Sequence, residues 1–213
     1  MTTPSSPNLG AEAWERRYQE GTTGWDLGQP APAFVTLLAS PQAPPPGSAI
    51  VLGAGRGYDA LLFARHGFAV TAVDFAPSAL ACLSQMAAAS GVTINLVQRD
   101  IFQLLPEFQG QFDYVIEHTC FCALDLSRRD AYGQLVADLL RPKGELLAIF
   151  FTHDRPGGPP FGSSPAELHQ RFSSQFELIT LEPVADSVPT RQGEEHLGRF
   201  RRPGPSSILK GRL

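Results

Sequence analysis

The sequence predicts an α/β fold with a doubly wound, Rossmann-like sheet of mostly parallel strands. Three observations support this prediction. Short apolar runs of strand length alternate with segments of helical character, as in chains that build a parallel sheet covered on both faces. The first run ends in a glycine-rich turn, and the second ends in an acidic residue. The length of 213 residues suits one domain of this kind.

The apolar runs and the residues that punctuate them give the expected elements in order. Strands are expected at residues 49–52, 68–73, 93–98, 112–116 and 145–151, and two further strands at 176–181 and 196–201. Helices are expected at residues 12–20, 34–39, 58–66, 77–90 and 128–140. Pro77 suits a first helical turn and Gly91 a helix end. Ser127 is expected to cap the last helix, which Pro142 and Gly144 end.

Composition disfavours several classes of protein. The net charge of −4 argues against a nucleic-acid partner, because phosphate binding requires a basic face. No apolar run approaches the roughly 20 residues of a membrane helix. Residues 1–10 lack the basic and apolar regions of a signal peptide. The three cysteines have neither zinc-site nor disulfide-framework spacing. We therefore expect a monomeric, cytoplasmic protein without a metal ion.

The glycine turn at residues 53–57 (GAGRG) predicts a ligand site. Ligands of doubly wound sheets bind at the carboxyl ends of the strands, and glycines such as Gly53 and Gly55 let a ligand approach the backbone closely. Asp74 ends the second strand, where a carboxylate can accept both ribose hydroxyls of an adenosine, with Phe75 beside it. Turn and acid together indicate an adenosine-containing cofactor.

The spacing of the glycines bears on which cofactor is bound. The dinucleotide fingerprint G-x-G-x-x-G requires a glycine where this chain has Tyr58, and the third glycine is Gly57 instead. This spacing argues against a nicotinamide-dependent oxidoreductase, which stays an alternative. Asp100 ends the third strand and is expected to accept from the adenine amino group, with Ile101 and Phe102 flanking the ring. Taken alone, Asp100 could equally cap the next turn.

Several stretches resemble the thiopurine methyltransferase superfamily, and within it the thiol, halide and thiocyanate methyltransferase branch. They are residues 14–18 (WERRY) with 24–30 (GWDLGQP), 52–59 (LGAGRGYD), 112–124 (FDYVIEHTCFCAL) and 157–161 (GGPPF). The resemblance implies a class I methyltransferase fold that uses S-adenosylmethionine and leaves S-adenosylhomocysteine. It also implies an N-terminal helical lid, whose aromatic residues Trp14, Tyr18 and Trp25 touch the cofactor. Aromatic faces attract the sulfonium cation of that cofactor.

The expected domain limits follow from the composition of the termini and from the extent of this resemblance, which runs from residue 14 to about residue 200. Residues 1–10 are expected to be flexible, residues 11–202 to form a single methyltransferase domain with 11–40 covering the cofactor, and residues 203–213 to be a disordered tail.

The end of the fourth strand departs from the family pattern. Glu117 and His118 stand where family members often have Asp-Tyr, so both are expected beside the cofactor. His118 is the predicted catalytic residue, with two roles left open. It could serve as a general base towards a thiol, since histidine titrates near pH 6.5 and a thiol near 8.5. It could instead position the substrate or cofactor by a hydrogen bond.

The expected acceptor is a small molecule: a thiol, a thiopurine, a halide or thiocyanate. An apolar pocket favours methyl transfer to such an anion because it removes the anion's hydration. The candidate walls are Phe121, Leu124, Phe150, Phe151 and Phe161. Arg155 or Arg191 could hold an anionic acceptor, and Cys120 and Cys122 are expected to be buried thiols behind the cofactor. The remaining alternative is a cofactor-binding module without turnover.

Overall fold

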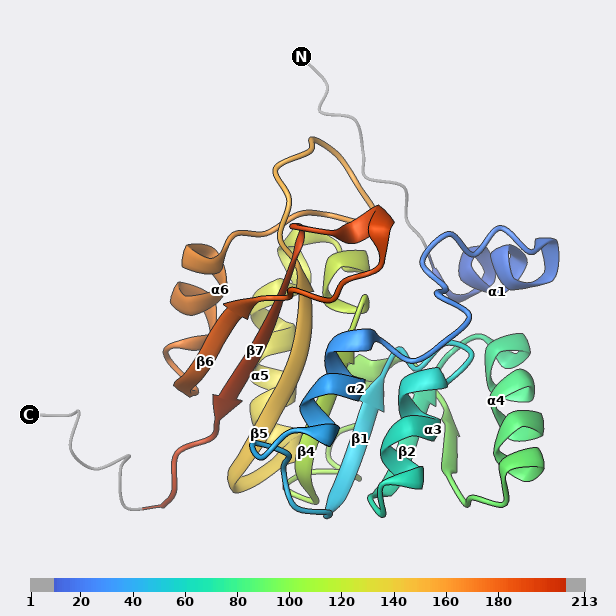
Figure 1. Ribbon diagram of the computed structural model, residues 1–213, viewed down its shortest axis with the longest axis horizontal. Coiled ribbons are helices and arrows are strands. Elements are labelled where there is room, and N and C mark those ends of the chain that lie inside the picture. Colours follow the sequence, from blue (N-terminus) through green and yellow to red (C-terminus); the bar gives the residue numbers. More distant parts are fainter. Residues whose placement is uncertain (1–9, 206–213) are drawn as a thin grey trace, which may run out of the picture.

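A seven-stranded sheet forms the centre of the protein in this computed structural model, which describes residues 10–205 (Figure 1). The strands are β1 (Ser48–Leu52), β2 (Ala69–Asp74), β3 (Asn95–Gln98), β4 (Phe112–His118), β5 (Leu140–Phe151), β6 (Glu177–Pro183) and β7 (Glu195–Arg201). Their order is β3-β2-β1-β4-β5-β7-β6. The first five strands are parallel, and β7 runs antiparallel to both of its neighbours. The predicted doubly wound, mostly parallel fold is confirmed.

Helices cover both faces of the sheet (Figure 1). The helices are α1 (Ala11–Glu20), α2 (Pro32–Ala39), α3 (Tyr58–Arg65), α4 (Pro77–Ser90), α5 (Arg129–Leu139) and α6 (Pro165–Phe172). Phe34 of α2 and Phe63 of α3 belong to the core on one face, and Tyr132 of α5 and Phe172 of α6 belong to the core on the other. Since both faces are buried, the middle parts of β1 (residues 49–52) and β4 (residues 114–116) are apolar.

Helix α6 was not predicted, although its sequence carries a start signal. The Ser164 side chain accepts a hydrogen bond from the Glu167 backbone N–H at 3.1 Å, and Pro165 occupies the first helical position. A serine cap followed by proline, with an acid three residues after the cap, is a helix-start pattern. Leu168 and Phe172 then fix the helix against the core.

Two predicted boundaries near residue 140 were wrong. Ser127 does not cap α5; it lies in a short 3-10 helix (Leu126–Arg128), where its N–H donates to Asp125. Strand β5 begins at Leu140 rather than at residue 145, because Leu140 pairs with Phe112 across an irregularity in the register. Backbone pairing across the bulge therefore carries the strand through Pro142 and Gly144.

The strand order reverses between β1 and β4, with β2 on one side of β1 and β4 on the other. A crevice forms at such a switch point, outside the carboxyl ends of the strands. Helix α1 lies above that edge of the sheet, next to the top of α4 (Figure 1). Of the predicted terminal segments, residues 1–9 and 206–213 lie outside the described residues, and the proposed domain limits stay a prediction.

Candidate active site

The turn after β1 requires glycine at its end. Gly57 has a φ of +81°, and a Cβ built there would lie 2.2 Å from Cδ1 of Leu83. A side chain at this position would therefore strain the backbone and collide with α4. Gly53, with φ of +60°, is also close to its neighbour, although less so, since a Cβ there would be 3.0 Å from Cβ of Cys120. The turn thus packs directly against the segment that follows β4.

The Asp74 carboxylate is held by the backbone around it. One carboxylate oxygen accepts from the Gly55 N–H at 2.8 Å, and the other accepts from the Ala76 N–H at 2.9 Å. A carboxylate has about four acceptor sites, so each oxygen retains capacity for a ribose hydroxyl. Burial raises the pKa of Asp74, although the backbone bonds from Ala76 and Gly55 oppose that shift. These features fit the predicted role of Asp74 in holding a ribose.

Asp100 caps a turn, and its contact with the adenine stays a prediction. Its Oδ1 accepts from the Phe102 N–H at 2.9 Å, which caps the 3-10 helix Ile101–Gln103. Its Oδ2 lies 3.9 Å from the Arg128 guanidinium, which stacks 3.8 Å above the Phe102 ring. Asp100, Ile101 and Phe102 also line the cavity described next. Capping one turn therefore leaves an oxygen of Asp100 for a ligand.

A cavity of about 620 Å³ lies at the carboxyl ends of the strands. Its volume falls within the range of about 300–1,000 Å³ typical of small-molecule sites. Eight predicted cofactor residues line it: Trp14, Tyr18, Trp25, Gly53, Asp74, Phe75, Asp100 and Ile101. Gly55 and His118 line a separate small hollow of about 50 Å³ instead. Glu117 lines neither of these two.

The aromatic residues of the N-terminal segment form one cluster over the cavity. The rings of Trp14 and Trp25 meet edge to face with centroids 4.8 Å apart, and Trp25 Nε1 donates to the Tyr18 hydroxyl at 3.3 Å. Burial raises the pKa of Tyr18, so its hydroxyl stays protonated. We call residues 11–31 the lid. Its aromatic faces can meet a cationic ligand, as predicted from the resemblance.

An acidic side chain of the lid docks it onto helix α4. Glu15 accepts from the Ser78 hydroxyl at 2.5 Å and from the Ser78 N–H at 3.1 Å. Helix α4 has no side-chain cap of its own at Ala76, so Glu15 satisfies one of its free N–H groups from another helix. The hydroxyl bond of Ser78 lowers the pKa of Glu15.

Glu117 is buried beneath the loop after β4. It accepts from the Tyr132 hydroxyl at 2.5 Å, from the Phe121 N–H at 3.0 Å and from the Cys120 N–H at 3.1 Å. Burial raises its pKa. These bonds shape the start of the loop after β4, where Thr119 and Cys120 line the cavity. The contact of Glu117 with the cofactor stays a prediction.

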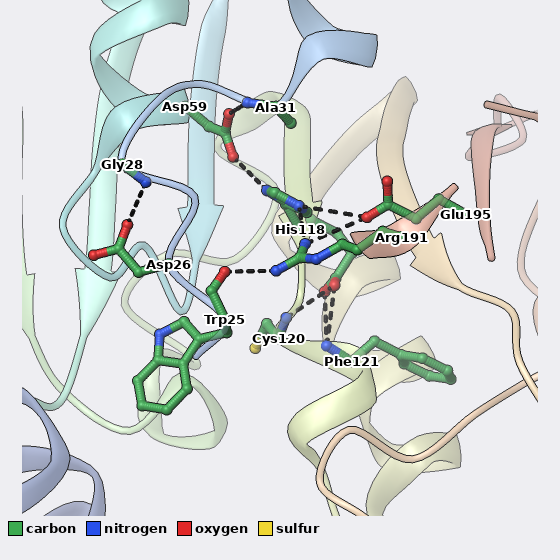
Figure 2. Close-up of polar contacts among 11 residues, drawn as sticks. Trp25, Asp26, Gly28, Ala31, Asp59, His118, Cys120, Phe121, Arg191 and Glu195 are labelled. Carbon is green, nitrogen blue, oxygen red and sulfur yellow. Dashed lines mark hydrogen bonds and ion pairs between the residues drawn. The ribbon is translucent and has the colours of Figure 1, made fainter. Parts of the chain in front are cut away.

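His118 lies in a buried polar network behind the cavity. Figure 2 shows Arg191 between Trp25, His118 and Glu195. His118 Nδ1 is 2.8 Å from an oxygen of Asp59, and its Nε2 is 3.1 Å from Arg191 Nη1. Both ring nitrogens are therefore engaged, which favours the positioning role over the base role. The catalytic role of His118 itself stays a prediction.

The other end of the cavity is apolar with one buried cation. Leu124, Phe151 and Phe161 line it together with Arg191, which is 5% exposed. Phe121 and Phe150, also considered from the sequence, belong to the hydrophobic core rather than to the cavity wall. Arg155 lines neither hollow and pairs with Glu194. Of the two arginines considered, the structure brings only Arg191 to the cavity.

A second buried arginine holds the loop that carries Phe161. Arg129 is 1% exposed and donates to the carbonyls of Phe161 at 2.9 Å and Gly162 at 3.0 Å. The Phe161 N–H in turn donates to the carbonyl of Cys122 at 2.7 Å. This part of the cavity wall is thus built by segments far apart in the sequence.

Cys120 and Cys122 both face the cavity, and neither forms a disulfide. Burial raises the pKa of Cys120 and raises that of Cys122 to about 12. Both thiols therefore stay protonated, and a role as thiolate nucleophile is disfavoured.

Sequence reasoning missed one cation on the lid. Arg17 lines the cavity, with its guanidinium 5.2 Å from the ring centre of Trp14 and 5.8 Å from that of Trp25. Its position three residues after Trp14 on a helix was the available signal, because residues at that spacing share a face. Within residues 10–205, no acidic residue pairs with Arg17 in a salt bridge.

Among residues 10–205, no group of histidine, cysteine, aspartate and glutamate side chains could hold a metal ion. None of the helices in that part of the chain has the length and apolar character needed to cross a membrane.

The doubly wound sheet, the ribose-type acid at the second strand and the aromatic lid define a class I S-adenosylmethionine-dependent methyltransferase. Comparison with known proteins agrees. The family described as "Thiopurine S-methyltransferase (TPMT)" matches residues 9–203. The chain belongs to the thiopurine S-methyltransferase family, which confirms the resemblance inferred from the sequence, and S-adenosylmethionine is its methyl donor.

Individual relatives extend this comparison. The chain is 31% identical to a protein described as "Probable thiol methyltransferase 2" and 30% identical to "Thiocyanate methyltransferase 1", both of Arabidopsis thaliana. Each match covers 89% of this chain and 84% of the relative. A solved structure reported as "Conversion of a Disulfide Bond into a Thioacetal Group during Echinomycin Biosynthesis" has a TM-score of 0.77. It is 24% identical, with 93% of this chain and 95% of that chain covered, and supports the fold.

Proposed function

We propose that the protein transfers a methyl group to the sulfur of a small thiol or thiopurine, or to a soft anion such as thiocyanate or a halide. The observation that carries this proposal is the part of the cavity lined by Leu124, Phe151 and Phe161 together with the buried Arg191, which we take as the acceptor end. Relatives described as thiol and thiocyanate methyltransferases support the same acceptors.

The residues of the chain would divide the work between them. Asp74 and Asp100 would hold the ribose and the adenine, and the lid aromatics would face the sulfonium. Arg17 would meet the carboxylate of the methionine tail, because it lines the cavity and has no acidic partner among residues 10–205. Bound S-adenosylmethionine supplies an electrophilic methyl carbon opposite a sulfur leaving group. The fixed walls hold the acceptor in line with that carbon.

The apolar wall would also lower the barrier through desolvation. An anionic acceptor loses its charge as it attacks a cationic donor, so the transition state is less polar than the reactants. Leu124, Phe151 and Phe161 would exclude water from the anion, and Arg191 would offset part of the cost of its desolvation. A thiol must first lose its proton, whereas halides and thiocyanate need no base.

A product assay tests the proposal. The protein is incubated with S-adenosylmethionine labelled in its methyl group and a panel containing benzenethiol, 6-mercaptopurine, thiocyanate and iodide. We expect a labelled, volatile or organic-soluble product from at least one of them, and none with the Asp74→Ala variant. Tight binding of S-adenosylhomocysteine without any methylated product would contradict the proposal and favour a module without turnover. Binding of NADH in its place would favour an oxidoreductase.

Cell location and oligomeric state are further parts of the proposal. We propose a cytoplasmic monomer without a nucleic-acid partner, as composition predicts. Light scattering coupled to size exclusion would report a mass near 23.0 kDa for the monomer, and a dimer mass would contradict it.

A further inference from the structure

The lid loop is fastened to the core by one buried arginine. Arg191 Nη2 donates to the carbonyl of Trp25 at 2.6 Å, and the two residues are 166 positions apart in the sequence. The Arg191 side chain is 6% exposed. Trp25 contributes its ring to the aromatic cluster over the cavity, so this backbone bond fixes where the ring can lie.

The hydrogen bond from Arg191 indicates which ring nitrogen of His118 carries the proton. A guanidinium has only donors, so its bond to His118 Nε2 at 3.1 Å requires an unprotonated nitrogen there. The ring proton must then reside on Nδ1, where it is donated to Asp59 at 2.8 Å. This arrangement corresponds to the Nδ1–H tautomer of His118. A proton on Nε2 would break the bond to Arg191 and bring two positive groups together.

Asp59 completes a closed ring of contacts around the lid loop. Its second oxygen accepts from the Ala31 N–H at 2.8 Å (Figure 2). The hydrogen bonds therefore run from Trp25 through Arg191, His118 and Asp59 to Ala31, which lies at the other end of the same loop. This chain of hydrogen bonds, from Trp25 to Ala31, holds both ends of the loop at residues 25–31.

Two carboxylates and one guanidinium surround the His118 ring. Glu195 of β7 lies 3.3 Å from Arg191 Nη1 and 4.0 Å from His118 Nε2, and Asp59 of α3 lies on the opposite side of the ring. Glu195 accepts a hydrogen bond from Arg191 Nη1, and Asp59 is the hydrogen-bond partner of His118 Nδ1. The remaining neighbour is the ring of Phe34 on α2, with its centroid 6.3 Å from that of His118.

From this geometry we infer that Asp59, His118 and Arg191 form a latch for the lid. His118 is a positioning residue: it orients Arg191, which holds Trp25 and thereby keeps the cofactor enclosed. Neither ring nitrogen is available as a base while the latch is closed. This inference rests on the proposed function, because it concerns the lid over the same cofactor site.

Two substitutions at His118 separate the latch from a base. In His118→Gln the amide oxygen reaches the place of Nε2 and still accepts from Arg191, whereas His118→Leu offers no acceptor. We measure the dissociation rate of S-adenosylhomocysteine by stopped-flow tryptophan fluorescence. Loss of a hydrogen bond to a charged group predicts release about tenfold faster from His118→Leu, with His118→Gln within about threefold of the natural protein.

Turnover with two acceptors provides the second readout. A latch predicts that turnover of benzenethiol and of iodide falls together in His118→Leu and is largely kept for both in His118→Gln. A base predicts that both variants lose turnover of the thiol while iodide, which carries no proton, is still methylated. That second pattern would overturn the inference.

A direct measurement on the natural protein does not depend on any variant. The ¹⁵N chemical shifts of the His118 ring should report a protonated Nδ1 and an unprotonated Nε2. A protonated Nε2 at neutral pH would contradict the latch even if His118→Leu failed to fold.

Controls distinguish failure of the latch from failure of the function. Arg155→Leu removes an exposed arginine outside the cavity and should release the ligand at the natural rate, unlike Arg191→Leu. If the natural protein binds no S-adenosylhomocysteine, the proposed function fails. If it binds and turns over but His118→Leu releases ligand at the natural rate, only the latch fails.

Discussion

The two ends of the cavity are built in different ways. At the adenosine end, Asp74 and Asp100 each accept a hydrogen bond from a backbone N–H two residues further along, at Ala76 and Phe102. At the acceptor end, Phe161 is placed by Arg129, which lies more than 30 positions away in the sequence. Local turns thus position the acids of the adenosine end, whereas long-range bonds position the acceptor wall.

This difference has a functional consequence. Strand ends and short turns hold the adenosine end, so it can bind one cofactor regardless of how the later loops are arranged. The acceptor end depends on loops that pack against one another, and loops on a rigid scaffold are where binding specificity is set. Substitutions at one end should therefore leave the other end's affinity largely intact.

The largest expected effect is at the adenosine end. Asp74→Ala removes both ribose acceptors and leaves the Gly55 and Ala76 N–H groups without partners. Affinity for S-adenosylhomocysteine should fall by about a hundredfold or more, as for loss of two hydrogen bonds to a charged group. Calorimetry measures this loss. An affinity near that of the natural protein would show that Asp74 does not hold the ribose. The adenosine end would then not depend on the local turn that positions Asp74.

Protonation of Asp74 should give a graded form of the same effect. Burial raises its pKa above that of an exposed aspartate, so protonation begins at a higher pH. Affinity for S-adenosylhomocysteine should fall as the pH is lowered through that pKa, because the protonated carboxyl has fewer acceptor sites. Without ligand, ionisation of Asp74 opposes folding, and its contribution to stability decreases as the pH rises through the folded pKa. A titration of affinity against pH, flat in Asp74→Asn, checks the assignment.

Loss of the hydrogen bonds that support the acceptor wall should lower the free energy of unfolding and weaken binding of the acceptor. Arg129→Met leaves the partly buried carbonyls of Phe161 and Gly162 without their donor, which costs about 1 kcal/mol of unfolding free energy per hydrogen bond lost. The KM for the acceptor should rise, with the cofactor affinity unchanged. Arg171→Met is the matched control, because Arg171 pairs with Asp130 and Glu167 and donates to neither carbonyl. Equal losses of cofactor affinity and acceptor affinity would contradict the statement that the two ends of the cavity bind their ligands independently.

The smallest expected effect is on a single wall residue. Phe161→Ala removes apolar surface from the acceptor end and should raise the KM for iodide or benzenethiol by about fivefold to tenfold, in line with burial of part of an aromatic side chain. Affinity for S-adenosylhomocysteine should not change. Steady-state kinetics with calorimetry on the same sample tests both statements, and a selective loss of cofactor affinity would reverse the assignment of the two ends.

Much of the fold could be predicted because its signals are local. Within residues 10–205, all seven strands and five of the six α-helices lie close to where apolar runs, Pro77 and Gly91 predict them. The missed helix α6 is short, and the prolines at residues 156, 159 and 160 favour a loop just before its start at Ser164. The boundary at Leu140 could not be predicted, because its strand character comes from pairing with Phe112 rather than from its own neighbours.

The sequence by itself determined the parallel sheet, the glycine turn, the acids at the strand ends and the aromatic residues of the lid. Each depends on residues within a few positions of one another, where backbone geometry limits the outcome. Only the tertiary structure decided the surroundings of His118, because its partners Asp59 and Arg191 are 59 and 73 positions away. The tautomer and accessibility of a histidine depend on such partners, so a sequence pattern can nominate the residue but cannot assign its chemistry.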